Sequence, residues 1–103
     1  MGKLPVVIDL ETKYTFRDYK DHKKLGVSVV GVYDYTTGNG STFMEDELHK
    51  LFSMLERASY IIGFNIDNFD LPVLQAYYPG KLSQFKTFDI LDDIREKIQK
   101  RIP

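Results

Sequence analysis

Apolar and polar residues follow two spacings along this chain, one typical of strands and one typical of helices. Runs rich in β-branched and aromatic residues predict five strands, over residues 5–11, 26–35, 41–44, 59–65 and 86–90. Apolar side chains three and four positions apart predict helices over residues 45–58, 71–78 and 91–102. The two glycines of the turn at 36–40 predict an antiparallel hairpin, whereas the strand over 59–65 follows a helix and should run parallel to the first strand. The pattern therefore predicts a single α/β domain.

The first predicted strand carries two carboxylates near its end. Residues 6–8 are Val-Val-Ile, consecutive apolar positions that are typical of a central strand covered on both faces. Asp9 and Glu11 follow two residues apart, so they point to the same side of the strand, with Cα atoms about 6.6 Å apart. Mutual repulsion and lost hydration would be relieved by a hard divalent cation such as Mg²⁺ or Mn²⁺. The alternative is a strand that runs into a polar turn, with both acids solvated.

Composition narrows the class of protein. The chain has 103 residues, 43% of them hydrophobic, which predicts one folded domain. The net charge of −1 provides no general basic field, so any contact with nucleic acid must come from local patches. There is no cysteine, and therefore no disulfide framework or zinc-thiolate site. We find neither a signal peptide nor a long apolar run, and we expect a cytoplasmic protein.

The predicted loop over residues 12–25 combines positive charge with aromatic rings. Its basic and aromatic residues are Lys13, Arg17, Lys20, Lys23 and Lys24, interleaved with Tyr14, Phe16 and Tyr19. Such a mixture can hold a phosphate backbone and stack a base. An ordinary solvated loop is the alternative, because Asp18 and Asp21 dilute the charge.

Two further acids have structural interpretations. Asp70 precedes the helix that contains Pro72, so its side chain could serve as an N-cap. Asp89 ends the fifth strand, and we favour a turn or cap role for it over an approach to a metal from the side.

The order of these elements and motifs resembles the ribonuclease-H-like fold, and more narrowly the DEDD (DnaQ-like) superfamily of 3′–5′ exonucleases. Residues 9–12 (DLET) resemble the first motif of that superfamily. Residues 63–72 (GFNIDNFDLP) resemble its second motif, in the form found in the proofreading domains of family-B DNA polymerases. With residues 26–33 and 87–91, the chain is most similar to bacterial and archaeal predicted exonucleases. The resemblance covers nearly the whole chain and implies a mixed sheet with strand order 3-2-1-4-5, in which strand 2 is antiparallel.

The resemblance also implies a set of site residues and a reaction. Asp9 would contact both metal ions, Glu11 one metal ion and the attacking water, and Asp70 the second metal ion. The expected cofactor is Mg²⁺ or Mn²⁺, two ions in the family and one ion here. The reaction would be hydrolysis of a phosphodiester bond at single-stranded 3′ ends of nucleic acid. The implied substrate-binding residues are Leu10, Thr12, Asn65 and Phe69.

One part of the family pattern is expected to be missing. The third motif supplies a fourth carboxylate, with a Tyr or His four residues before it, on a C-terminal helix packed across the sheet. The sequence ends at residue 103 before such a motif, so we expect a truncated domain with impaired activity. One face of the sheet should be short of cover, which favours a homodimer or completion by another segment. The alternative is a catalytically weak nucleic-acid-binding or protein-interaction module, which in the first case would use residues 13–24 and the basic residues Arg95, Lys97, Lys100 and Arg101.

Overall fold

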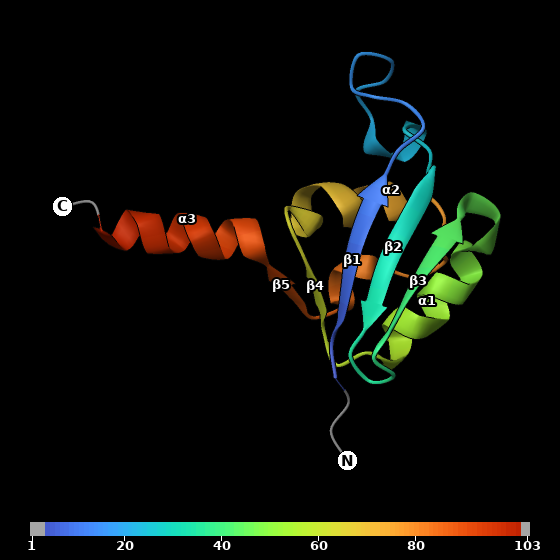
Figure 1. Ribbon diagram of the computed structural model, residues 1–103. Helices are drawn as coiled ribbons and strands as arrows, with labels where there is room; N and C mark the ends of the chain where they lie inside the picture. The colour runs from blue at the N-terminus through green and yellow to red at the C-terminus, as the bar shows by residue number, and fades with distance from the viewer. Residues whose placement is uncertain (1–3, 102–103) are drawn as a thin grey trace.

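A five-stranded mixed sheet organises the chain in the computed structural model, which describes residues 4–101 (Figure 1). The strand order is β3-β2-β1-β4-β5. β2 pairs antiparallel with both β1 and β3, whereas β4 pairs parallel with both β1 and β5. This order and these directions confirm the predicted α/β, ribonuclease-H-like arrangement. The strands are β1 (Val6–Glu11), β2 (Val29–Asp34), β3 (Asn39–Met44), β4 (Ile61–Gly63) and β5 (Thr87–Asp89).

Helices form where the spacing predicted them, with different boundaries. They are α1 (Leu48–Arg57), α2 (Leu71–Leu74) and α3 (Ile90–Arg101), accompanied by the single turns η1 (His22–Lys24), η2 (Glu45–Glu47), η3 (Ile66–Asp70) and η4 (Leu82–Gln84). The helix predicted over 71–78 stops early, because residues 76–78 donate to carbonyls three residues back. The side chain of Gln75 stabilises the chain after α2, because its amide donates to Gly80 O and accepts from Leu82 N–H. No helix within residues 4–101 has both the length and the hydropathy that crossing a membrane requires.

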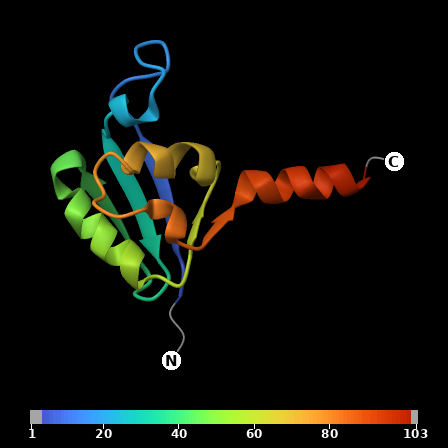
Figure 2. The ribbon, with the colours of Figure 1, turned by 180° about the vertical axis from the view of Figure 1, so that it is seen from behind.

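The core fills one side of the sheet only. Leu51 and Leu55 of α1 and Leu74 of α2 are buried together with the strand residues on that side. α1 and α2 lie behind the sheet in Figure 1 and in front of it in Figure 2. The buried strand residues on this side are Val6, Ile8, Leu10, Val30, Val32 and Ile61.

The opposite side of the sheet is open. On β1, Val7 is half-buried while Asp9 and Glu11 are exposed, so the prediction of a first strand covered on both faces is wrong. The consecutive apolar run suggested cover on both faces, but Val7 pairs laterally with Tyr33 and Ile62, and the described helices α1 and α2 lie on the other side of the sheet. We call this side the open face, and the register assigns it Val7, Asp9, Glu11, Val29, Tyr33, Met44, Ile62 and Phe88.

α3 projects away from the rest of the molecule at the β5 edge (Figures 1 and 2). It follows β5 without an intervening loop residue. No residue of Ile90–Arg101 is buried.

Candidate functional site

Asp9 and Glu11 lie in the second half of β1, where the strand still pairs with β2 but no longer with β4. The alternation of the strand sends Ile8 and Leu10 into the core and both carboxylates to the open face. Asp9 lies opposite Gly31 of β2, where no side chain competes for the space above the strand. Both acids share one side of the strand and are exposed to solvent, as the alternative of solvated acids expects.

Asp70 lies near Asp9 as a buried carboxyl group, with 5% of its surface exposed. Burial, followed by the negative charge of Asp9, raises the pKa of Asp70 from an ordinary value of 3.8 to about 7, while the backbone N–H of Leu10 acts in the opposite direction. Asp9 and Leu10 can act in this way only if Asp70 is close to β1. The side chain of Asp70 makes no capping hydrogen bond to α2, so the N-cap alternative does not describe it.

The chain after β4 explains how Asp70 reaches β1. β4 pairs only with the first two residues of β1, through Val6–Ile61 and Val7–Ile62. Beyond Gly63 the chain turns through Asn65, which has a φ of 59°, into η3. A Cβ at position 63 would collide with Ile66 Cγ2 and lie 3.1 Å from Ile8 O, so only glycine allows η3 to approach β1 this closely.

A second acidic group lies at the edge of the sheet. Among residues 4–101, the trio of potential ligand residues whose oxygens all lie within 4.8 Å of one another is Asp67, Asp89 and Asp92, a group that could hold a metal ion. The predicted trio of Asp9, Glu11 and Asp70 is not brought together at that spacing. The second group was not predicted from the sequence, because Asp67 lies 22 positions before Asp89 and the two meet only through the fold.

Asp89 has a structural function in that group. Its Oδ1 accepts from Asn65 N–H at 2.8 Å and from Leu91 N–H at 3.0 Å, and its Oδ2 accepts from Asp67 N–H at 3.0 Å. Three of roughly four acceptor positions of the carboxylate are therefore occupied. The prediction that Asp89 acts as a cap acid is confirmed, and its side chain holds β5, η3 and α3 together.

Asp9 and Asp70 differ from the Asp67–Asp89–Asp92 group in the charges and hydrogen bonds that surround their carboxylates. Burial, the charge of Asp9 and the charge of Asp89 all raise the pKa of Asp70, and a nearby positive ion would oppose all three. Asp and Glu oxygens are the ligands that Mg²⁺ and Mn²⁺ prefer. The carboxylate of Asp89, in contrast, already accepts hydrogen bonds from three backbone N–H groups.

An aromatic cluster borders Asp70. The ring centroids of Phe16 and Phe69 are 5.8 Å apart, those of Phe16 and His22 5.1 Å, and both pairs meet edge to edge or edge to face. The loop over residues 12–25 is therefore folded against Phe69, the residue before Asp70. Phe16 remains 46% exposed, and Tyr14 and Tyr19 form a further edge-to-face pair beside it.

The four predicted substrate-binding residues differ in burial and in the contacts they make. Phe69 is half-buried in the aromatic cluster. The side chain of Leu10 points into the core, so only its backbone is available on the side of Asp70. Thr12 Oγ1 donates to Tyr14 O at 2.7 Å, which fixes the start of the loop. Asn65 contributes its backbone N–H to Asp89 and its left-handed conformation to the turn.

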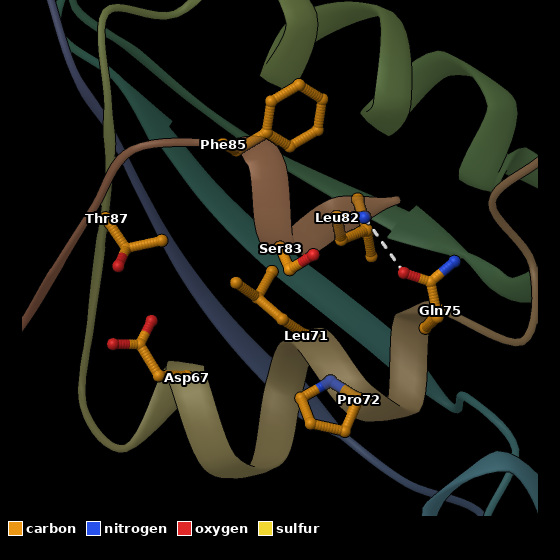
Figure 3. Close-up of a pocket in the computed structure, with 8 residues that line it drawn as sticks. All are labelled: Asp67, Leu71, Pro72, Gln75, Leu82, Ser83, Phe85 and Thr87. Atoms are coloured by element: carbon orange, nitrogen blue, oxygen red, sulfur yellow. Dashed lines mark hydrogen bonds between the residues drawn. The ribbon is translucent and has the colours of Figure 1, made fainter. Parts of the chain in front are cut away.

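A pocket of about 330 Å³ lies on the helical side of the sheet, away from Asp9 and Glu11 (Figure 3). Leu71, Leu82 and Phe85 form apolar walls, and Asp67 and Thr87 lie near one another at one end. Its volume is at the lower end of the roughly 300–1,000 Å³ typical of ligand sites. None of the sequence-predicted site residues lines this pocket, whose lining is Asp67, Leu71, Pro72, Gln75, Leu82, Ser83, Phe85 and Thr87.

Comparison with known proteins supports the fold. No family model matches the chain, and no curated protein sequence matches it. Among solved structures, the chain is similar to the family B DNA polymerase from the hyperthermophilic archaeon Pyrobaculum calidifontis, with a TM-score of 0.68 and 16% sequence identity. The match covers 93% of this chain and 16% of the polymerase chain. At this identity the likeness is one of fold.

Proposed function

We propose that this chain is the core of a metal-dependent 3′–5′ exonuclease that acts on single-stranded ends of nucleic acid. The observation that carries the proposal is the position of buried Asp70 beside Asp9 of β1, where the charge of Asp9 makes Asp70 harder to ionise. The sequence motifs at residues 9–12 and 63–72 support it. The similarity in fold to a family B DNA polymerase supports it as well.

In this proposal Asp9, Glu11 and Asp70 hold Mg²⁺ or Mn²⁺. When bound, the metal would supply a water nucleophile at neutral pH and positive charge opposite the phosphodiester oxygens. Asp70 must lose its proton before it can serve as a ligand, and its pKa of about 7 makes this step sensitive to pH. Glu11 lies two residues further along the same strand face, where it would orient the water.

The substrate would reach these acids along the loop over residues 12–25. Exposed rings stack bases without sequence preference, at roughly 1–3 kcal/mol per base. Phe16 presents such a ring directly against Phe69, one residue from Asp70. Positive charge for the phosphates comes from the exposed basic residues of the same loop, Arg17, Lys20, Lys23 and Lys24.

A nucleic-acid-binding module without catalysis is the second candidate, because the exposed aromatic and basic loop does not depend on metal. Both candidates allow a second copy or another segment to bind the sheet. The open face is the surface that this copy or segment would cover.

Nuclease assays on the full chain test the proposal. With Mn²⁺ and a 5′-labelled single strand, we expect a ladder of products shortened from the 3′ end, abolished by Asp9→Asn. The matched control is Asp46→Asn, which removes an exposed carboxylate on η2 and should leave cleavage unchanged. Salt-dependent binding without cleavage would favour the second candidate, and Phe16→Ala should then weaken binding about tenfold or more. Cleavage that persists in Asp9→Asn would reject the proposed site.

A further inference from the structure

Within residues 4–101, two apolar surfaces are left without a covering element. The first is the open face, on which Tyr33 and Phe88 are 41% and 45% exposed. The second is a stripe along α3, on which Ile94 and Ile98 are 43% and 52% exposed. Soluble domains rarely leave contiguous apolar surfaces of this kind uncovered, and when they do the surfaces mark interaction sites.

We infer that two copies of this chain exchange their α3 helices, so that the α3 of each copy lies across the open face of the other. The inference rests on these exposed surfaces and not on the proposed exonuclease activity.

The start of α3 prevents the helix from covering its own sheet. β5 ends at Asp89 and α3 begins at Ile90, so no loop residue is available to reverse the chain. Asp89 accepts hydrogen bonds from Leu91 N–H in α3 and from Asn65 N–H after β4, which fixes the direction of the helix relative to the sheet. Folding α3 back over its own open face would break these bonds, whereas a second copy can bring its own sheet to the helix.

The two surfaces also match in size. At about 1.5 Å per residue, the 12 residues of α3 extend roughly 18 Å. With neighbouring strands about 4.8 Å apart, the five strands of the sheet span about 19 Å between the two outer ones. One α3 helix is therefore nearly as long as the open face is wide.

The apolar residues of the open face line up across the sheet. The register aligns Phe88 with Ile62, Ile62 with Val7, and Val7 with Tyr33, so these side chains form one row that crosses four strands. Asp9 and Glu11 lie further along β1, beyond that row. The exchange closes after two subunits because both contacts are identical.

Light scattering coupled to size exclusion tests the exchange in the full chain. We expect the wild type at twice the protomer mass of 12.0 kDa, and Ile98→Asp at the protomer mass. Gln99→Asp is the matched control, because it introduces the same side chain at the neighbouring position, about 100° around the helix from Ile98, and should leave the dimer intact. Far-UV circular dichroism checks that each variant is folded.

A second variant identifies which surfaces meet. Tyr33→Asp alters the open face and leaves α3 untouched, so it should also be monomeric alone. An equal mixture with Ile98→Asp should recover dimers, because the intact helix of one variant can bind the intact face of the other. A Tyr33→Asp protein that stays dimeric would indicate that the two helices contact each other. An Ile98→Asp protein that stays dimeric would indicate that the two open faces contact each other. Either result overturns the exchange, as does a monomeric wild type.

Cross-linking gives an independent measurement, because the chain contains no cysteine. A mixture of Ile98→Cys and Tyr33→Cys proteins should form a disulfide-linked heterodimer under mild oxidation. Gln99→Cys in place of Ile98→Cys should not form it. Equal cross-linking from both helix positions would overturn the inference.

Discussion

Asp70 should make this protein less stable as the pH rises through the neutral range. In the folded state burial and the charge of Asp9 raise the pKa of Asp70 to about 7, whereas the unfolded chain ionises near the ordinary value of 3.8. Between these two values the folded state binds more protons than the unfolded state, so the free energy of unfolding falls with increasing pH. The loss begins near pH 4 and is complete above about pH 7.

The size of the effect follows from the shift. A difference of about three pH units, at 1.36 kcal/mol each, corresponds to about 4 kcal/mol of lost stability above neutrality. This is a large share of the roughly 5–15 kcal/mol that stabilises a domain of this kind. Asp70→Asn removes the ionisation while keeping the size of the side chain, so it should abolish most of the loss.

Urea unfolding in EDTA at pH 4, 5, 6, 7 and 8, followed by circular dichroism, measures this. At pH 8 we expect Asp70→Asn to be about 2–4 kcal/mol more stable than the wild type, a shift of the urea midpoint by about 1–3 M. At pH 4 the two proteins should differ by less than about 1 kcal/mol. The exposed control Asp46→Asn should follow the wild type at every pH. Parallel profiles for the wild type and Asp70→Asn would refute the buried, charge-coupled environment of Asp70.

Three further substitutions test contacts in the fold. Gly63→Ala should lower the free energy of unfolding by about 1–3 kcal/mol, because its Cβ would meet Ile66 Cγ2. The control Gly31→Ala should be nearly neutral, because its Cβ would meet only Asp9 O at 3.8 Å. Equal effects of the two substitutions in thermal unfolding would contradict this explanation. Asp89→Asn should cost about 1–3 kcal/mol, because an amide cannot accept all three N–H bonds, and amide hydrogen exchange should speed up at Leu91; unchanged protection there would show that the clamp is unimportant. Tyr77→Phe removes the 2.6 Å bond from Tyr77 Oη to Glu45 Oε2 and should cost about 1 kcal/mol in urea unfolding, and a variant as stable as the wild type would argue against that bond in solution.

The sequence was sufficient for the topology because each strand has a local signature. The Gly-rich turn at 36–40 predicted the hairpin of β2 and β3, and the helix over 45–58 predicted the parallel return to β1. Strand order also came from the resemblance, and the structure confirms it. The ends of the helices were less predictable. The helix predicted over 71–78 ends at Leu74, because the side chain of Gln75 forms hydrogen bonds with Gly80 and Leu82.

The candidate site was predictable only in part, since it depends on contacts between distant residues. The D-x-E spacing placed Asp9 and Glu11 on one face of β1, as the structure has them. The approach of Asp70 to β1 requires the missing side chain of Gly63, and the Asp89 clamp requires backbone groups from η3 and α3. Neither contact leaves a periodic signal in the sequence. The consecutive valines at positions 6 and 7 even suggested a covered strand, although one side of it is open.

Calorimetric titration with Mn²⁺ at pH 7.5 tests most directly which carboxylates hold the metal. The account expects binding by the wild type that is lost in Asp9→Asn and in Asp70→Asn and retained in Asp92→Asn. Binding that survives both Asp9→Asn and Asp70→Asn but disappears in Asp92→Asn would place the ion on the Asp67, Asp89 and Asp92 group and contradict the proposed site.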